Sequence, residues 1–216
     1  MVTKETENLY NDYLSQSDSR WEYGNSILYR MCKEEPKHKE IDVIVGKVWL
    51  IGRSYAAAIE RRKNAVDDND DFYYDVVAPK MLEIGSELDD RITRLQESTG
   101  HIVDDVEEIL STHKFLTDTF GKMTGLKKRS LASKYLHFHC PEKFFIYDSR
   151  AIKSIGKLVK RPDKKFLVNV SDYDQEYGDF VCRMLELQEY LYEKLGTCEM
   201  PRSIDGFLLW TLRKKK

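Results

Sequence analysis

Apolar residues recur at intervals of three and four along most of the chain, and this helical periodicity restricts the fold more than any other feature. In residues 41–62 (IDVIVGKVWLIGRSYAAAIERR), the pattern fits either one long helix or two helices hinged near Gly52 and Arg53. The one strand-like run, residues 166–170 (FLVNV), has no obvious second run to pair with. The sequence therefore predicts an all-α fold.

Proline, glycine and capping residues divide this pattern into segments. Gly125 and Pro141 are expected to end helices, Pro79 is expected to kink or break one, and Asp148 stands in an N-cap position. After an acidic loop at 67–71, helices are expected over residues 72–96, 103–123, 130–139, 149–159, 173–195 and 203–212.

The length of 216 residues fits one large domain or two small interlocked ones, and 41% hydrophobic residues suffice for a core. No apolar run approaches the roughly 18–20 residues that span a bilayer, and the first residues lack an apolar signal region. The four cysteines are scattered without a CxxC pair, which argues against zinc. We therefore expect a cytoplasmic protein with free thiols, no metal and no membrane partner.

Positive charge is concentrated in one block of the chain. Residues 122–165 contain 13 Lys or Arg and three Asp or Glu, a formal charge of +10, although the whole chain carries −2. The remaining residues therefore carry −12. Such a separation predicts a basic face that could bind nucleic acid, and the alternative is an ordinary solvated surface of mixed charge.

Residues 123–138 read as a helix, a short glycine turn and a second helix. The first N–H groups of a helix lack partners within it, and its dipole places positive charge there, so such an end accepts phosphate. Lys127, Lys128 and Arg129 stand at that start, and Lys134 follows one turn later. We expect a phosphate clamp that contacts the nucleic-acid backbone, with a plain helical hairpin as the alternative.

Asp148 follows the apolar run FFIY at the edge of the basic block. An aspartate before a helix commonly caps it. A carboxylate in these surroundings can also stabilise positive charge on a sugar or orient an attacking water. One residue can serve both purposes, because a cap holds the carboxylate in place.

Three consecutive pieces of this segment are TGLKKRSLAS (124–133), PEKFFIY (141–147) and DSR (148–150). Together they resemble the helix-hairpin-helix motif and the following loop of base-excision DNA glycosylases, the superfamily of 8-oxoguanine glycosylase and endonuclease III. The resemblance implies that Asp148 is the catalytic aspartate. It places Ser130, 18 positions earlier, where the family has its catalytic lysine.

The segment also departs from the family pattern. Lys128 replaces the second glycine of the hairpin, and Arg150 replaces the histidine two residues after the aspartate. Serine at the lysine position implies a monofunctional glycosylase without lyase chemistry, unless Lys134 or Lys128 takes the lysine's role. Arg150 and Lys134 would hold flanking phosphates or position Asp148.

The resemblance further implies a two-lobed helical bundle with a cleft between the lobes. Residues 1–70 plus 170–216 would form the first lobe, and residues 71–169 the second, which contains the hairpin (124–138) and the Asp148 loop. Arg53 and Tyr55 would line the base pocket or fill the gap left by an extruded base. The alternative is a core-facing Tyr55 and an Arg53 paired with Glu60.

The function implied is that of a DNA glycosylase, which extrudes a damaged or modified base from duplex DNA and hydrolyses its glycosidic bond. No cofactor is expected, because an iron–sulfur cluster needs four closely spaced cysteines and only Cys182 and Cys198 lie near the C-terminus. A non-catalytic DNA-binding module and a helical protein-interaction domain remain alternatives. The sequence leaves open the base, the oligomeric state, and the choice between repair and defence against modified phage DNA.

Overall fold

The structure, a computed structural model, describes residues 2–16, 21–61, 71–196 and 198–214. Its fold is all-α, as predicted, and the β-structure in these ranges is an isolated antiparallel bridge between Val2 and Val159. The helices are α1 (Thr6–Leu14), α2 (Glu22–Glu34), α3 (Ile41–Ser54), α4 (Ala78–Glu83), α5 (Gly85–Glu97), α6 (Val106–Thr124), α7 (Arg129–His139), α8 (Ser149–Leu158), α9 (Gln175–Leu195) and α10 (Pro201–Arg213).

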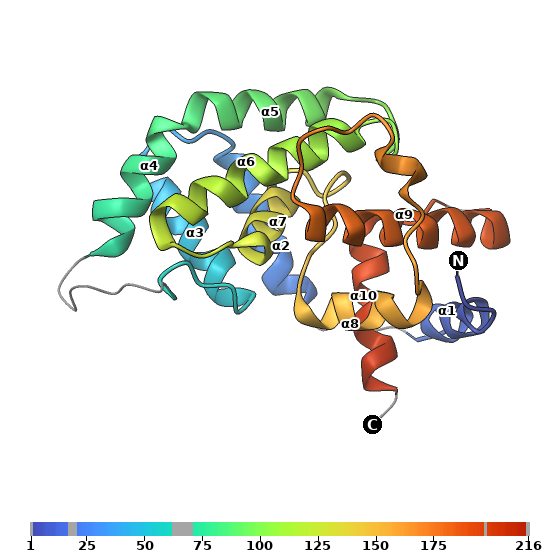
Figure 1. The fold of residues 1–216 in the computed structure, drawn as a ribbon. Coiled ribbons are helices and arrows are strands. Elements are labelled where there is room, and N and C mark those ends of the chain that lie inside the picture. Colours follow the sequence, from blue (N-terminus) through green and yellow to red (C-terminus); the bar gives the residue numbers. More distant parts are fainter. Residues whose placement is uncertain (1, 17–20, 62–70, 197, 215–216) are drawn as a thin grey trace.

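Helix α7 lies in the middle of the molecule and packs against α2, α3 and α6 (Figure 1). Every residue from 131 to 139 is buried, which a helix can sustain only when neighbours cover it on all sides. Helices α1, α8, α9 and α10 lie at one end, where α10 packs against both α8 and α1. Helices α3, α4, α5 and α6 lie towards the other end.

Residues far apart in the sequence meet at the α8–α10 end. The Thr3 N–H donates to the Leu158 carbonyl at 2.9 Å, beside the Val2–Val159 bridge. Trp210 Nε1 donates to Gln16 Oε1 at 2.9 Å, across 194 positions of the chain. The start of the described chain is therefore fixed against α8 and α10.

Several expected element boundaries need correction. Residues 41–62 contain one helix, α3, which ends at Ser54, and position 62 and most of the acidic loop lie outside the described residues. The expected helix over 72–96 is three pieces: a π-helical turn η1 (Tyr73–Val77), α4 and α5. The strand-like run at 166–170 overlaps a 3₁₀ turn, η2 (Lys164–Leu167).

Gly85 begins α5 directly after the break at Ile84. A Cβ atom at this position would lie 2.6 Å from the His38 carbonyl oxygen, so glycine permits a close approach of two backbones. Pro79, the second residue of α4, cannot donate a backbone hydrogen bond, and the π-helical turn η1 directly precedes α4.

The division into lobes of residues 1–70 plus 170–216 and 71–169 stays a prediction. Helix α3 packs against α4 and α7, so the two expected units share a contact through these helices.

Candidate active site at the start of helix α8

Asp148 caps α8, as the sequence predicted. Its Oδ1 accepts hydrogen bonds from the backbone N–H groups of Arg150 and Ala151, both at 2.9 Å. The preceding connector fixes its position, because Phe144 and Phe145 are fully buried and the Tyr147 N–H donates to Ser133 Oγ at 3.0 Å. Both the cap and the buried connector therefore hold this carboxylate in one place.

The second carboxylate oxygen of Asp148 is differently placed. Oδ2 lies 3.9 Å from Lys134 Nζ and 3.8 Å from the Arg150 guanidinium, both beyond hydrogen-bond distance. The side chain is 13% exposed. One oxygen is thus used by the cap, and the other faces two cations and remains within reach of solvent.

Lys134 is buried directly beside Asp148. Its Nζ donates to Ser130 Oγ at 2.9 Å and to the Tyr55 carbonyl at 3.1 Å. Burial lowers the pKa of the Lys134 amine, and the charge of Asp148 opposes that fall. The structure therefore brings together Asp148, Lys134, Ser130 and Tyr55 from four separate positions of the sequence.

Arg53 and Tyr55 have different surroundings. The Arg53 guanidinium is 58% exposed and pairs with Glu60, the pairing named above as the alternative. The Tyr55 hydroxyl donates to Asn25 Oδ1 at 2.7 Å, and its ring packs edge-on to Phe138 with centroids 5.3 Å apart. Of the two, Tyr55 joins the Asp148 cluster, through its backbone carbonyl.

A second carboxylate, Asp205 on α10, lies near this cluster and was not among the residues predicted from the sequence. It is 2% exposed, and its Oδ2 accepts from the Arg202 guanidinium at 2.5 Å, while Oδ1 has no hydrogen-bond partner. Burial raises the pKa of Asp205 to about 6; Arg202 opposes this rise and the charge of Asp148 adds to it. The sequence pattern, with Asp205 between Ile204 and Phe207 on the apolar face of α10, indicates that Asp205 is buried but not that it lies near Asp148.

The turn between α6 and α7, residues 125–128, has the predicted glycine geometry. Gly125 ends α6 in the left-handed region, with φ of 68°. Lys128 Nζ donates to the Ala58 carbonyl at 3.3 Å and also to the Arg61 carbonyl, and burial lowers the pKa of this lysine. Lys128 therefore binds backbone oxygens of the segment after α3.

Arg129 is also engaged within the molecule. Its Nε donates to Asp174 at 2.6 Å, its guanidinium lies 3.1 Å from Glu176, and its side chain is 15% exposed. Lys127 is 68% exposed and lies 3.9 Å from Asp174. Of the three cations expected to form the clamp, Lys127 is thus the one that faces solvent.

Helix α8 carries a row of cations on its exposed face. Arg150, Lys153 and Lys157 recur at helical spacing and are all exposed. In the described part of the chain, Lys153 and Lys157 have no ion-pair partner. The basic block thus combines cations held inside the molecule around the α6–α7 turn with free ones along α8.

Comparisons with protein-family models, with curated proteins and with solved structures find no match for this chain. No described helix is both long and apolar enough to cross a membrane. Among the residues that the structure describes, no three His, Cys, Asp or Glu side chains are grouped so that they could hold a metal ion.

Proposed function

We propose that this chain is a DNA glycosylase-like protein that binds duplex DNA, extrudes a damaged or modified base and hydrolyses its glycosidic bond with Asp148. The observation that carries the proposal is that the helix cap uses only one of the two oxygens of the Asp148 carboxylate. Asp148 Oδ1 is fixed by two backbone N–H groups, while Oδ2 is unbonded among the described residues and faces solvent at the edge of a basic helix.

The chemistry needs a carboxylate in this state. As the bond between the base and C1′ of the sugar breaks, the base takes the electron pair and positive charge develops on the sugar. Asp148 Oδ2 would stabilise that charge or accept a proton from the water that attacks C1′. Because the cap prevents the carboxylate from turning, little reorganisation would be needed during the reaction.

Lys134 supports hydrolysis rather than lyase chemistry. A Schiff base requires the amine to reach C1′, whereas Lys134 is 2% exposed and donates to Ser130 and Tyr55. We assign Lys134 the role of a positioning residue. Its charge attracts the Asp148 carboxylate, and its hydrogen bond to the Tyr55 carbonyl links α7 to the segment after α3.

The proposal also includes the finer features of the fold. Helices α6 and α7 with Gly125 would form the helix-hairpin-helix motif, and the two ends of the molecule would be lobes that DNA approaches from the α8 side. Lys127, Arg150, Lys153 and Lys157 are exposed and would contact phosphates. The proposal gives Lys128 and Arg129 a supporting role in the turn.

A non-catalytic DNA-binding module is the second candidate. In favour of this candidate, the cap of α8 alone explains an aspartate at position 148. This candidate keeps the basic row of α8 and needs no reaction at Asp148.

The test is release of free base, detected by mass, from a panel of duplexes with damaged or modified bases. Asn caps helices about as well as Asp, so Asp148→Asn removes the charge and keeps the cap. Asp163→Asn is the matched control, because Asp163 caps η2 through the Lys165 N–H at 3.0 Å and is exposed.

Release by the wild type and by Asp163→Asn, with loss in Asp148→Asn, would support the glycosylase. Equal rates in all three proteins would exclude a catalytic role for Asp148. Salt-sensitive DNA binding with no release from any duplex would favour the second candidate.

A further inference from the structure

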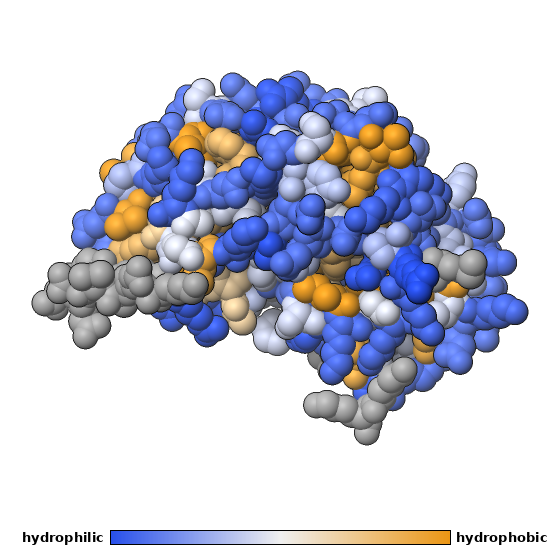
Figure 2. Space-filling model, in the orientation of Figure 1, coloured by the Kyte–Doolittle hydropathy of each residue, from blue (hydrophilic) through white to orange (hydrophobic). Residues whose placement is uncertain are grey.

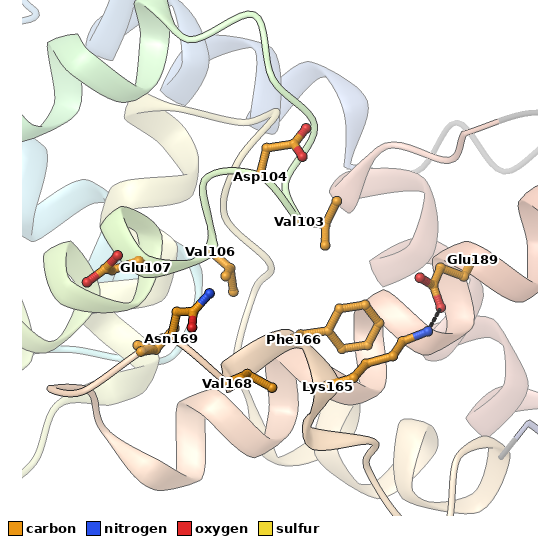
Figure 3. Close-up of a pocket in the computed structure, with 10 residues that line it drawn as sticks. Val103, Asp104, Val106, Glu107, Lys165, Phe166, Val168, Asn169 and Glu189 are labelled. Carbon is orange, nitrogen blue, oxygen red and sulfur yellow. Dashed lines mark hydrogen bonds and ion pairs between the residues drawn. The ribbon is translucent and has the colours of Figure 1, made fainter.

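A surface groove lies beside α9, on the side of α9 that faces away from α8 (Figure 1). Its walls are the loop between α5 and α6 (residues 98–105), the segment 164–172, and α9. A hollow of about 510 Å³ forms its middle (Figure 3). It continues into hollows of about 400 Å³ and about 300 Å³, which share lining residues with it: Asp104, Glu107 and Val170 on one side, and Val103, Phe166 and Glu189 on the other.

The groove contains more exposed apolar side chains than most protein surfaces do. Val168 is 79% exposed, Tyr192 57% and Val103 43%. Figure 3 shows Val103, Phe166 and Val168 around the middle of the hollow, and Figure 2 shows an apolar area there, surrounded by hydrophilic residues. Exposed apolar groups gathered in a hollow and rimmed by polar residues are typical of interaction sites.

The rim of the groove is acidic. Asp104 and Glu107 have no ion-pair partner among the residues that the structure describes, and Asp104 accepts a hydrogen bond from the His101 N–H at 2.8 Å. Lys165 lies at the rim, but its charge is balanced by Glu189 at 2.7 Å. Its amine covers the Phe166 ring at 4.7 Å from the centroid.

We propose that this groove binds an extended segment of a partner protein in which Lys or Arg side chains flank an apolar anchor residue. The apolar anchor would pack against Val103, Phe166 and Val168, and the cations would pair with Asp104 and Glu107. Charge complementarity selects this occupant, because the carboxylates of the rim repel both phosphates and acidic segments.

The groove and the proposed DNA-binding face can be occupied together. In Figure 1, α9 lies between α8 and the loop 98–105. A partner held in the groove therefore leaves Arg150, Lys153 and Lys157 free. This inference does not depend on the reaction at Asp148.

The experiment uses four fluorescein-labelled nonapeptides of equal length: basic with apolar residues, basic with polar residues, acidic with apolar residues, and neutral with apolar residues. Fluorescence anisotropy with the full chain measures the affinities. We expect the basic–apolar peptide to bind at least about tenfold more tightly than the other three, and more weakly as salt is added.

Two groove variants locate the binding. Asp104→Asn with Glu107→Gln removes the charge of the rim and keeps an acceptor for the His101 N–H, and Val168→Ser removes an apolar side chain that is already exposed without adding a charge. Each should weaken the basic–apolar peptide about tenfold or more. The matched controls, Glu34→Gln and Leu14→Ser, alter an exposed acid and an exposed apolar residue on α2 and α1, and should bind as the wild type does.

Equal affinity for all four peptides, or equal affinity of the groove variants and the wild type, would overturn the proposal. A dimer in light scattering that Val168→Ser dissociates would also overturn it, because the occupant would then be a second copy of the chain. Thermal unfolding of each variant shows that a loss of binding does not come from a loss of fold.

Discussion

The α6–α7 turn and the start of α8 belong to the same basic block, but they use their charges in opposite ways. At the turn, Arg129 pairs with Asp174 and Glu176, and Lys128 binds two backbone carbonyls. Around the start of α8, Asp148 Oδ2 and Asp205 Oδ1 lack hydrogen-bond partners among the described residues.

This difference separates residues that hold the fold from the residues to which we assign a function. Removing a member of a satisfied pair leaves its partner buried and unpaired, which costs stability. Removing a group that is itself unsatisfied costs little and can stabilise the protein, a pattern typical of functional sites. The position of a cation within a basic block is thus a poor guide to its role until its partners are known.

The largest expected effect tests the functional side of the comparison. Under the proposed function, Asp148→Asn should slow base release by about 10²-fold or more, while the free energy of unfolding changes by less than about 0.5 kcal/mol. Single-turnover release and urea unfolding measure the two quantities. If Asp148→Asn lost stability but kept the wild-type rate, Asp148 would be a structural residue and not a catalytic one.

The next effect tests the structural side. Arg129→Ala should destabilise the protein by about 2–4 kcal/mol, because it leaves Asp174, which is 6% exposed, without its main cation. Arg94→Ala is the control, since Arg94 is exposed and pairs with the partly exposed Glu108, and should cost less than about 1 kcal/mol. If Arg129→Ala alone lowered the salt dependence of DNA binding, the result would support the prediction of a phosphate clamp at the turn.

A smaller effect concerns pH and Asp205. Its pKa of about 6 in the folded protein lies above the value of about 3.9 expected for an unfolded chain. The folded state therefore binds the proton more tightly, so this group reduces stability progressively as pH rises from about 4 to about 6, and by a constant amount above that.

Asp205→Asn should accordingly stabilise the protein by about 1–2 kcal/mol at pH 8 and have little effect at pH 4. The loss of the pair with Arg202 is expected to offset part of the gain. Denaturant unfolding at the two pH values measures this. The control is Asp172→Asn, at a carboxylate that is 81% exposed, and it should leave the stability unchanged at both pH values. If Asp205→Asn were less stable than the wild type at pH 8, the prediction would be contradicted.

The smallest effect concerns the free cations of α8. Lys153→Ala and Lys157→Ala should each weaken DNA binding a few-fold and reduce the slope of log K against log salt by about 0.9, the value for one phosphate contact. Stability should change by less than about 0.5 kcal/mol. Lys33→Ala, at an exposed lysine of α2, is the control and should leave the slope unchanged.

The sequence predicts best those features that depend on neighbouring residues. The cap at Asp148 and the turn at Gly125 are local signals, and the structure has both. The pair of Arg53 and Glu60 joins residues seven positions apart and could be named as an alternative. Ionic partners close in the sequence are few enough to consider one by one.

Features that depend on the folded chain were not predicted. Arg129 meets Asp174, 45 positions later, and Lys128 meets Ala58, 70 positions earlier. Nothing near Gly85 in the sequence shows that the His38 backbone approaches it. Asp205 joins the surroundings of Asp148 only because α10 packs against α8, so the second carboxylate of the site required the structure.

The link between Gln16 and Trp210 has a consequence for the order of folding. Contacts that join distant parts of a chain require the closure of long loops, and they form slowly. Helices α2, α3, α6 and α7 can pack as they leave the ribosome, whereas α1 and α8 complete their packing only after α10 has been synthesised. Asp205 on α10 therefore reaches the surroundings of Asp148 at the same late stage at which Ile204, Phe207 and Leu208 of α10 join the core.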